Sequence, residues 1–376
     1  MSVSLGIPRI RGAELVPSGA GRAAGLVDRH GRRATDLRLS VIDKCNLRCT
    51  YCMPAAGLPW LPAAQLMSPA EITRIVGIAV DLLGVTELRL TGGEPLVRPD
   101  LEEIVAAVAA AHPGLPISLT TNGIGLTTRA AGLAAAGLGR INVSLDSLDA
   151  DTFAALARRD RLAEVLAGAE AAAAAGLVPV KINAVLMRGV NDHEAPELLG
   201  WALGRGFALP FIEQMPLDAD HGWTREHLVT AAEIRHRLGQ RFRLVAHPGP
   251  RAGAPAQLWE VHPHATATTT TATGTGEAAG DAALGTVGII ASVTEPFCDQ
   301  CTRTRITAEG RVRSCLFSHE EVDLLGLLRA GATDAEVADR WRAAMWAKPA
   351  AHGMDRPGLG SPGYVQPERS MSAIGG

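Results

Sequence analysis

Between residues 37 and 215, short apolar runs rich in β-branched residues alternate with longer segments of helical character. The first helical segment opens with Ser68, Pro69 and Glu71, which combine a capping box with a proline in the first turn. Strands are expected at 37–42, 87–91, 117–120, 140–145, 178–186 and 211–215, with helices at 68–83, 100–112, 129–136, 162–175 and 193–204. This alternation predicts parallel βα units and places the chain in the α/β class.

The number of βα units sets the expected architecture. A closed barrel of this type needs eight units, so six units predict an open, incomplete (β/α)6 TIM-type barrel, followed by a C-terminal extension. A doubly wound sheet is the alternative, but its usual glycine-rich turn after the first strand is absent. In a βα barrel, the residues that follow the strands gather at one face, and active sites lie there.

Beyond residue 217 the alternation stops, and composition divides the chain into four parts. These parts are a loosely ordered arm at 1–33, the partial barrel at 34–228, a C-terminal region at 229–348 and a flexible Pro/Gly-rich tail at 349–376. Helices are expected in the C-terminal region at 230–241 and 333–347. Residues 264–285 are an Ala/Thr/Gly stretch of low complexity, which predicts a disordered insertion.

Charge and hydrophobicity narrow the class of protein. The 376 residues carry a net charge of −3, which excludes a globally basic nucleic-acid binder, so an anionic substrate would need a local cluster of cations. Only three of the 36 basic residues are lysines: Lys44, Lys181 and Lys348. The chain lacks an apolar run long enough to span a membrane and a secretory leader, so we expect a cytoplasmic protein.

Three cysteines follow the first predicted strand with the spacing Cys45-x3-Cys49-x2-Cys52. Three thiolates within a short loop can hold three corners of one soft metal centre. A structural zinc ion and a [4Fe–4S] cluster both want four protein ligands, so three cysteines leave one metal position open for chemistry. The alternative is a structural zinc completed by a distant residue.

The other three cysteines lie in the C-terminal region, at Cys298, Cys301 and Cys315. They also lack a fourth partner, which indicates a second open iron–sulfur cluster, whereas zinc would need a ligand such as His319. Arg303 and Arg305 lie between these cysteines and share one face of an extended segment. A set of cations at the expected active-site face predicts a polyanionic ligand; it comprises Arg38, Arg89, Lys181, Arg303 and Arg305.

The first cysteine loop, with Tyr51 before its last cysteine, resembles the radical S-adenosylmethionine superfamily. Thr91-Gly92-Gly93-Glu94-Pro95, at the end of the second strand, resembles the GGE motif of the same superfamily. The resemblance implies that Cys45, Cys49 and Cys52 hold a [4Fe–4S] cluster whose open iron binds S-adenosylmethionine. It also implies that Tyr51, Gly93, Ser144 and Met215 line the S-adenosylmethionine pocket.

Within that superfamily, the chain resembles the GTP 3',8-cyclase family of molybdenum cofactor biosynthesis from about Asp36 to Phe317. The motifs are 36–41, 90–95, Arg140 to Asp146, Phe211-Ile212-Glu213 and Phe297-Cys298-x2-Cys301-Thr302-Arg303. The resemblance implies a lyase that abstracts the ribose 3' hydrogen of GTP and joins C3' to guanine C8. The product, 3',8-cyclo-7,8-dihydro-GTP, would pass to a second enzyme that makes cyclic pyranopterin monophosphate.

The same resemblance implies roles in GTP binding and catalysis. The residues around GTP would be Arg38, Arg89, Thr120, Lys181, Arg303, Thr304 and Arg305, and the catalytic set would be Arg303, Arg305, Gly375 and Gly376. Cys298, Cys301 and Cys315 would hold a second [4Fe–4S] cluster whose open iron meets the guanine. The C-terminal Gly375 and Gly376 would enter the barrel mouth beside the nucleotide.

The implied partners are GTP and an external electron donor of flavodoxin or ferredoxin type, with no nucleic acid or membrane, and the chain would be a monomer or homodimer. Two positions depart from the family pattern: Glu87 and Pro210 stand where a basic residue and an arginine are usual. Two alternatives stay open, namely a radical S-adenosylmethionine enzyme that modifies peptides and a zinc-stapled binding protein.

Overall fold

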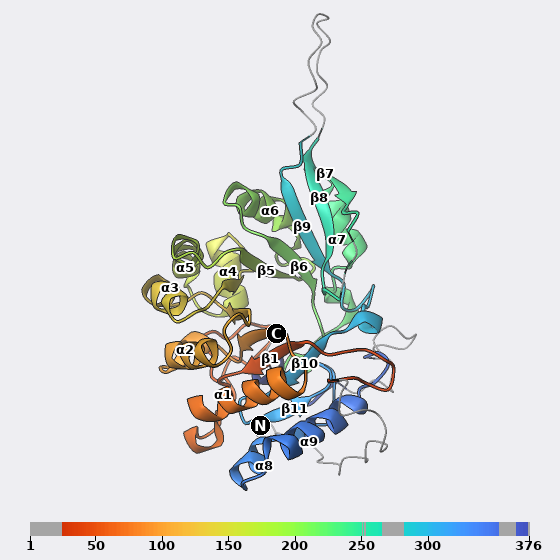
Figure 1. Cartoon of the computed structure of the whole chain (residues 1–376). Coiled ribbons are helices and arrows are strands. Elements are labelled where there is room, and N and C mark those ends of the chain that lie inside the picture. Colours follow the sequence, from red (N-terminus) through yellow and green to blue (C-terminus); the bar gives the residue numbers. More distant parts are fainter. Residues whose placement is uncertain (1–24, 250, 252, 265–281, 353–365, 375–376) are drawn as a thin grey trace, which may run out of the picture.

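The computed structural model describes residues 25–249, 251, 253–264, 282–352 and 366–374. Its centre is one curved sheet of twelve strands, in the order β12-β11-β10-β1-β2-β3-β4-β5-β6-β9-β8-β7 (Figure 1). Six parallel strands form the middle of this sheet: β1 (Asp36–Ser40), β2 (Glu87–Thr91), β3 (Ile117–Thr121), β4 (Arg140–Ser144), β5 (Val180–Leu186) and β6 (Leu209–Glu213). The expected open (β/α)6 barrel is therefore confirmed.

Helices cover the outer face of the six parallel strands (Figure 1). They are α1 (Pro69–Gly77), α2 (Leu101–Ala111), α3 (Leu126–Ala135), α4 (Ala150–Ala157), α5 (Leu162–Ala174) and α6 (Ala195–Gly204). The sequence pattern missed α4, a short helix that begins where the Asp149 side chain accepts a hydrogen bond from the Thr152 amide. The first helix is also shorter than expected, because the α-helical backbone changes to a π-turn over Ile78–Leu82.

The C-terminal region extends the sheet at both edges. Strand β9 (Gly285–Ile290) pairs in parallel with β6 and continues into the antiparallel β8 (Gln257–Pro263) and β7 (Phe242–Ala246). At the other edge, β10 (Arg303–Ile306) pairs in parallel with β1 and leads to β11 (Arg311–Arg313) and β12 (Val322–Asp323). The remaining helices are α7 (Ala231–Leu238), α8 (Leu325–Arg329), α9 (Asp334–Trp346) and α10 (Met371–Ile374).

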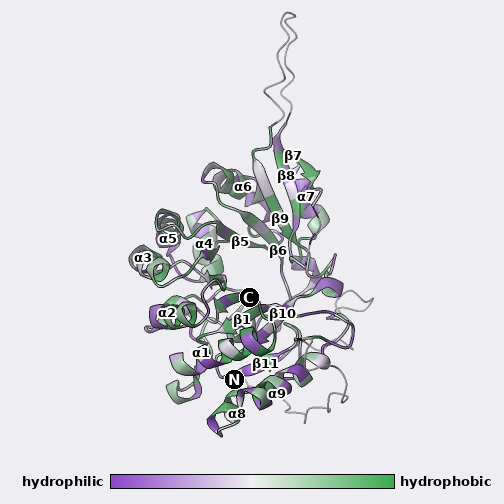
Figure 2. Cartoon of the chain, in the orientation of Figure 1, coloured by the Kyte–Doolittle hydropathy of each residue, from purple (hydrophilic) through white to green (hydrophobic). Residues whose placement is uncertain are grey.

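Alternation along the strands separates the core from the concave face. In β1, Leu37 and Leu39 are fully buried against the helices, whereas Arg38 between them faces the inside of the sheet. Figure 2 shows strands such as β5 and β6 coloured mainly as hydrophobic, which fits their position between the cavity and the outer helices. Within the described ranges, no helix is long and apolar enough to cross a membrane.

Candidate active site

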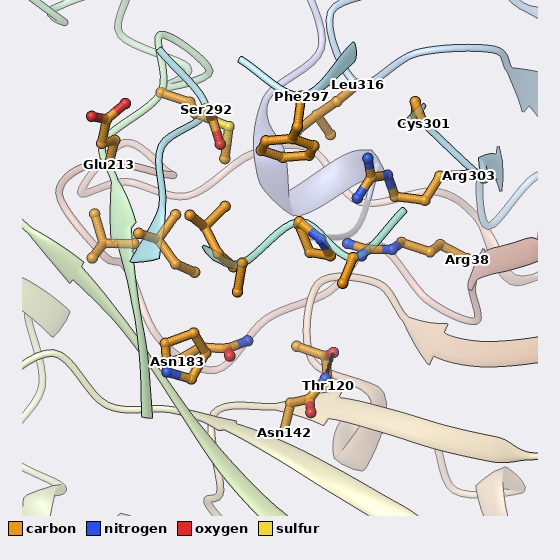
Figure 3. Close-up of a pocket in the computed structure, with 18 of the residues that line it drawn as sticks. Arg38, Thr120, Asn142, Asn183, Glu213, Ser292, Phe297, Cys301, Arg303 and Leu316 are labelled. Atoms are coloured by element: carbon orange, nitrogen blue, oxygen red, sulfur yellow. Dashed lines mark hydrogen bonds between the residues drawn. The ribbon is translucent and has the colours of Figure 1, made fainter. Parts of the chain in front are cut away.

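A cavity of about 480 Å³ lies against the concave face of the sheet (Figure 3). Its walls come from the carboxyl halves of the barrel strands, from the β7–β8 connection and from the segments on either side of β10. It contains most of the residues singled out in the sequence: Arg38, Tyr51, Arg89, Thr120, Ser144, Lys181, Met215, Cys298, Cys301, Arg303, Arg305 and Cys315. Among these predicted residues, the fold brings together side chains that are up to 277 positions apart, from Arg38 to Cys315.

Strand register aligns three arginines across neighbouring strands. Arg38 of β1 is paired with Arg305 of β10 on one side and with Arg89 of β2 on the other. Burial, together with the charge of Arg89, lowers the pKa of Arg38 well below its usual value. The Nε atoms of Arg38 and Arg89 are buried and have no hydrogen-bond partner among the described residues. An anionic ligand would supply the missing acceptors and counter-charge.

Asp36 is the acid that lies nearest to this arginine row. Its carboxylate is 3.7 Å from the Arg38 Nε atom. Burial opposes its ionisation, but the surrounding arginines hold the pKa of Asp36 below its usual value. One carboxylate faces several guanidinium groups, so this side of the cavity has an excess of positive charge.

A second row of polar side chains crosses β3, β4 and β5. Thr120, Asn142 and Lys181 are register partners, and the Asn142 Nδ2 atom donates to the Thr120 Oγ1 atom at 3.2 Å. Burial lowers the pKa of Lys181, because an ammonium is costly away from water. Figure 3 shows Asn142, Asn183 and Thr120 at the floor of the cavity, opposite Arg303. Asn142 and Asn183 were not assigned a role from the sequence, although each belongs to a strand already predicted to reach the site.

Thr304 lies outside the cavity. It is fully buried on the opposite face of β10, and its Oγ1 atom accepts a hydrogen bond from Trp341 Nε1 at 2.9 Å. Its neighbours Arg303 and Arg305 face inward, as strand alternation requires. The guanidinium groups of Arg303 and Arg251 both lie about 4.9 Å or less from the centre of the Phe297 ring, which supports them at the cavity wall.

The loop with the first three cysteines is fixed by hydrogen bonds at both ends. The amides of Arg48 and Thr50 donate to the last carbonyls of α4, at Ala157 (3.0 Å) and Leu156 (2.9 Å). At the start of the loop, the Gly93 amide donates to Ile42 O and the Glu94 amide donates to Lys44 O. Gly93 does not line the cavity. It packs against the cysteine loop, where a Cβ would lie 2.3 Å from the carbonyl oxygens of Asp43 and Lys44.

Glu94 connects this loop to the next strand. Its buried carboxylate accepts hydrogen bonds from the Leu96 amide, the Thr121 hydroxyl and the Asn122 amide, at 2.6 to 2.9 Å. Burial raises the pKa of Glu94 to about 7 despite these bonds. The Asn122 side chain in turn lies 3.9 Å from the Cys45 sulfur. The GGE motif therefore fixes the cysteine loop through contacts on the side of β2 and β3.

Tyr51 points from the cysteine loop to a carboxylate in the cavity. Its hydroxyl donates to Asp146 Oδ2 at 2.6 Å, and the Val185 amide donates to Asp146 Oδ1 at 2.8 Å. Burial raises the pKa of Asp146 to about 6. Ser144 and Met215 line the same cavity, so three of the four residues assigned to S-adenosylmethionine lie together.

The two cysteine sets consist of free thiols, with no disulfide among the six. Within the described residues, no three His, Cys, Asp or Glu side chains converge on the position of a single metal ion. The fit to an iron–sulfur cluster rests on donor chemistry, because each set supplies three thiols. Burial, with the other thiols of each set as smaller causes, raises the pKa of Cys49 and of Cys298. Three thiols is the number of ligands that a [4Fe–4S] cluster with one open iron would take from each set.

The second cysteine set has cationic neighbours. Burial opposes ionisation of Cys301, but Arg303 and Lys348 outweigh it and lower its pKa to about 6. Lys348 was noted only as one of three lysines, and Arg32 and His352, which also lie near this set, carried no signal in the sequence. Glu213, in the Phe-Ile-Glu motif, accepts hydrogen bonds from the Ala231, Val293 and Thr294 amides, and so fixes the segment that leads to Cys298.

The remaining assigned positions lie at the edges of the site or beyond the described residues. Gly375 and Gly376 are outside the described ranges, as are most of the expected arm, insertion and tail. The preceding helix α10 reaches the cavity, because Met371 lines it and the Met371 amide donates to Leu217 O at 3.0 Å. Pro210 lines the cavity, whereas Glu87 forms an ion pair with Arg140 at 3.0 Å.

Comparison with known proteins gives a consistent picture. Residues 39–202 match the model of the Radical SAM superfamily, and residues 207–354 match the model named Molybdenum Cofactor Synthesis C. A protein named GTP 3',8-cyclase from Paenarthrobacter nicotinovorans is 64% identical over 365 residues, which cover 96% of this chain and 99% of that protein. Another of the same name from Mycolicibacterium smegmatis is 56% identical over 353 residues, covering 93% and 92%. Among solved structures, Streptococcus suis SuiB bound to precursor peptide SuiA is 18% identical, with a TM-score of 0.45 and coverage of 56% of this chain and 46% of that one.

Proposed function

The chain belongs to the GTP 3',8-cyclase family of radical S-adenosylmethionine enzymes, and on this premise we propose how its cavity performs the cyclisation. The enzyme abstracts the ribose 3' hydrogen of GTP and joins C3' to guanine C8. This forms 3',8-cyclo-7,8-dihydro-GTP, in the first step of molybdenum cofactor biosynthesis. The expectation of a radical S-adenosylmethionine lyase is confirmed by the high identity over nearly the whole chain.

One observation carries the assignment of roles. A single cavity is lined by Tyr51 from the first cysteine loop, by the cations on β1, β2, β5 and β10, and by all three cysteines of the second set. A substrate in this cavity would contact both cysteine-bearing segments at once. That arrangement suits a reaction in which one end of a nucleotide is held while its sugar is attacked.

In this proposal, Cys45, Cys49 and Cys52 hold a [4Fe–4S] cluster, which with S-adenosylmethionine supplies a 5'-deoxyadenosyl radical when both are bound. Tyr51, Ser144 and Met215 contact S-adenosylmethionine directly. Gly93 acts differently, because its lack of a side chain lets β2 approach the cysteine loop. The second set, Cys298, Cys301 and Cys315, would hold a second [4Fe–4S] cluster, which would bind the guanine of GTP.

The cations that line the cavity bind and orient GTP. Arg38, Arg89 and Lys181 neutralise the triphosphate, and Thr120 donates a neutral hydrogen bond beside them. Arg303 and Arg305 lie between these cations and the second cysteine set. They therefore bind the part of GTP that lies between its triphosphate and its guanine. Thr304 contributes through Trp341, by fixing the face that β10 presents.

The C-terminal glycines are proposed to reach the substrate from α10. Arg369 forms ion pairs with Glu309 and Glu321, and Gln366 donates to Asp218 O at 2.6 Å, so the segment before α10 is anchored at the barrel mouth. Ile374, at the end of α10, is 1% exposed and so is packed against the rest of the protein. Gly375 and Gly376 would add backbone donors and acceptors with no Cβ in a crowded site.

The proposal extends to partners and location. A cytoplasmic enzyme would take electrons from a flavodoxin- or ferredoxin-like donor and pass its product to the synthase of cyclic pyranopterin monophosphate.

Cysteine-to-serine variants test the assignment of the two sets. Substitution at Cys45, Cys49 or Cys52 should abolish 5'-deoxyadenosine formation, because the first cluster loses a ligand.

Substitution at Cys298, Cys301 or Cys315 should instead stop GTP cyclisation while leaving some uncoupled cleavage of S-adenosylmethionine. Both products are measured by anaerobic turnover and mass analysis, with iron content and circular dichroism as controls for folding. Equal loss of both activities from well-folded variants of the second set would contradict two separate centres.

A further inference from the structure

Lys348 lies beside the second cysteine set, two residues beyond the end of α9. Its side chain is only 3% exposed, and its Nζ atom is 3.2 Å from the Cys301 sulfur and 2.9 Å from the Arg303 carbonyl oxygen. No carboxylate lies within ion-pair distance of it among the described residues. An ammonium is costly to bury without a counter-charge, so the Cys301 sulfur is the group that offsets its charge.

The backbone around Lys348 is held in place from the N-terminal side of the chain. The Arg32 guanidinium donates to the carbonyl oxygens of Cys298 (2.6 Å), Pro349 (2.5 Å) and Ala350 (2.7 Å). Arg32 is itself oriented by the buried Asp28, at 2.6 Å. One side chain therefore ties the loop of the second cysteine set to the segment that follows Lys348.

The far end of this segment is fixed as well. The His352 ring bonds to Ser292 O at 2.8 Å, and its centre lies 5.0 Å from that of the Phe317 ring. Helix α9 ends just before Lys348, and the segment that follows is held at 349–350 and at His352, so the backbone that carries Lys348 is fixed on both sides. Its contact is thus built into the fold rather than made by a mobile surface lysine.

We propose that Lys348 is a positioning residue that tunes the second iron–sulfur site, by donating a charge-assisted hydrogen bond to the sulfur of Cys301. This inference rests on the proposed cluster at Cys298, Cys301 and Cys315. Hydrogen bonds and positive charge at a ligating sulfur favour the reduced, more negative cluster and so raise its reduction potential. Lysine can make this contact because its ammonium carries a full positive charge and three hydrogen-bond donors.

The test uses the full-length chain with Cys45, Cys49 and Cys52 changed to serine, so that only the second set can bind a cluster. After anaerobic reconstitution with ferrous iron and sulfide, iron per chain is measured, and a dithionite titration followed by electron paramagnetic resonance gives the midpoint potential. The variants are Lys348→Met, Lys348→Gln and Lys348→Arg. The control, Arg340→Met, also removes one positive charge from the α9 region, but from a position without a contact to the cysteines.

We expect the midpoint potential to become more negative in Lys348→Met and Lys348→Gln, and to stay near that of the parent in Lys348→Arg and Arg340→Met. Loss of iron from both neutral variants but not from Lys348→Arg would also support the contact, because the positive charge would then be needed to retain the cluster. Unchanged potentials in iron-loaded neutral variants would overturn the role of Lys348, as would loss of iron from all three. A parent that binds no iron would instead overturn the second cluster itself, together with the inference that depends on it.

Discussion

Gly93 packs its Cα atom against the backbone of the first cysteine loop. A Cβ there would lie 2.3 Å from the carbonyl oxygens of Asp43 and Lys44, and no side-chain rotation can relieve contacts with backbone. The backbone at Gly93 is not left-handed, so close approach rather than torsion requires the glycine. Cys45 directly follows Lys44 in this loop, so its position depends on residue 93 being a glycine.

Gly93→Ala should displace this loop and lower the iron bound at the first set by more than about twofold, with a parallel loss of 5'-deoxyadenosine. Iron content after anaerobic reconstitution, measured in a chain whose second set is changed to serine, checks the prediction. Gly204→Ala at the end of α6 is the matched control, because nothing lies within 4 Å of its added Cβ. Full iron loading in Gly93→Ala would show that the loop can yield at no cost.

At this scale, the sequence was informative wherever a motif fixed both residue type and strand position. The inward-facing Arg38, Arg89 and Lys181 could be predicted because each lies on a recognisable strand. Thr304 could have been placed outside the cavity by the same alternation, since its neighbours on both sides were assigned to the inside. Lys348 and Arg32 could not, because their partners lie 47 and 266 positions away in the chain.

Arg329 joins two helices that belong to different parts of the chain. From the last turn of α8 it donates to Glu71 at the start of α1 (2.7 Å) and to the carbonyl oxygens of Ala64 (2.8 Å) and Leu66 (3.0 Å). Glu71 also completes the capping box with Ser68. The Arg329 hydrogen bond lowers the pKa of Glu71 to about 2, from an ordinary value of 4.5.

A carboxylate with a lowered pKa stabilises the folded state while it is ionised. The contribution of Arg329 should therefore be present above pH 4.5 and decline as pH falls toward 2. Arg329→Met should lower the free energy of unfolding at pH 7 and lower it by less at pH 3, because part of the contribution of ionised Glu71 is lost by then. Chemical denaturation at several pH values measures this difference. Arg161→Met, which breaks an exposed pair with Glu164, should change stability little at any pH; a pH-independent effect of Arg329→Met would contradict the ionic explanation.

Elements with strong periodicity could be predicted and short edge elements could not. Strands β1 to β6 appear close to their expected positions because each is an apolar run between helices. Strand β10 was expected only as an extended segment that carries Arg303 and Arg305, because two inward-facing arginines remove the apolar alternation that would mark a strand of the sheet. Strands β11 and β12 have only three and two residues, too few for any pattern to emerge.

The whole molecule works as one sheet whose two ends come from the C-terminal region. Strand β9 extends the barrel beyond β6, and β10 extends it beyond β1, so the segment between them carries Cys298 and Cys301 across the open side of the barrel. This explains how the second cysteine set comes to face the strands that carry the cations. The sequence predicted a separate C-terminal region, and pairing between strands so distant in the chain has no local signal.

The end of the chain should act at the cavity that α10 reaches. Deleting Gly375 and Gly376 should leave iron content and 5'-deoxyadenosine formation largely intact but cut the cyclised product by more than about tenfold, or roughly 1.4 kcal/mol in barrier. The ratio of cyclised nucleotide to 5'-deoxyadenosine is the measurement. A short C-terminal tag should have the same effect, whereas the same tag at the N-terminus serves as control. An unchanged ratio in the truncated chain would remove the glycines from the catalytic set.

The low-complexity stretch connects β8 and β9 at the end of the hairpin that is remote from the cavity. Gln257 and Leu258, at the start of β8, and Ile290, at the end of β9, line the cavity, whereas Pro263 and Gly285 lie at the opposite ends of these strands. Six steps along β8 separate Gln257 from Pro263 by roughly 20 Å at the usual rise of a strand. Changes in the chain beyond Pro263 should therefore not alter the binding or the cyclisation of the substrate.

Replacing residues 265–281 with Asn-Gly should leave both iron content and cyclisation within about twofold of the parent, because the antiparallel pairing of β8 and β9 permits a short turn. Iron analysis and the rate of cyclised product measure the outcome. Inserting the same Asn-Gly between Ala254 and Pro255, at the cavity end of the hairpin, is the matched contrast and should lower the rate strongly, since both residues line the cavity. A large loss of iron or solubility in the replacement would show that residues 265–281 pack against the rest of the protein, and similar rates in the two variants would show that the hairpin end near Gln257 does not shape the substrate site.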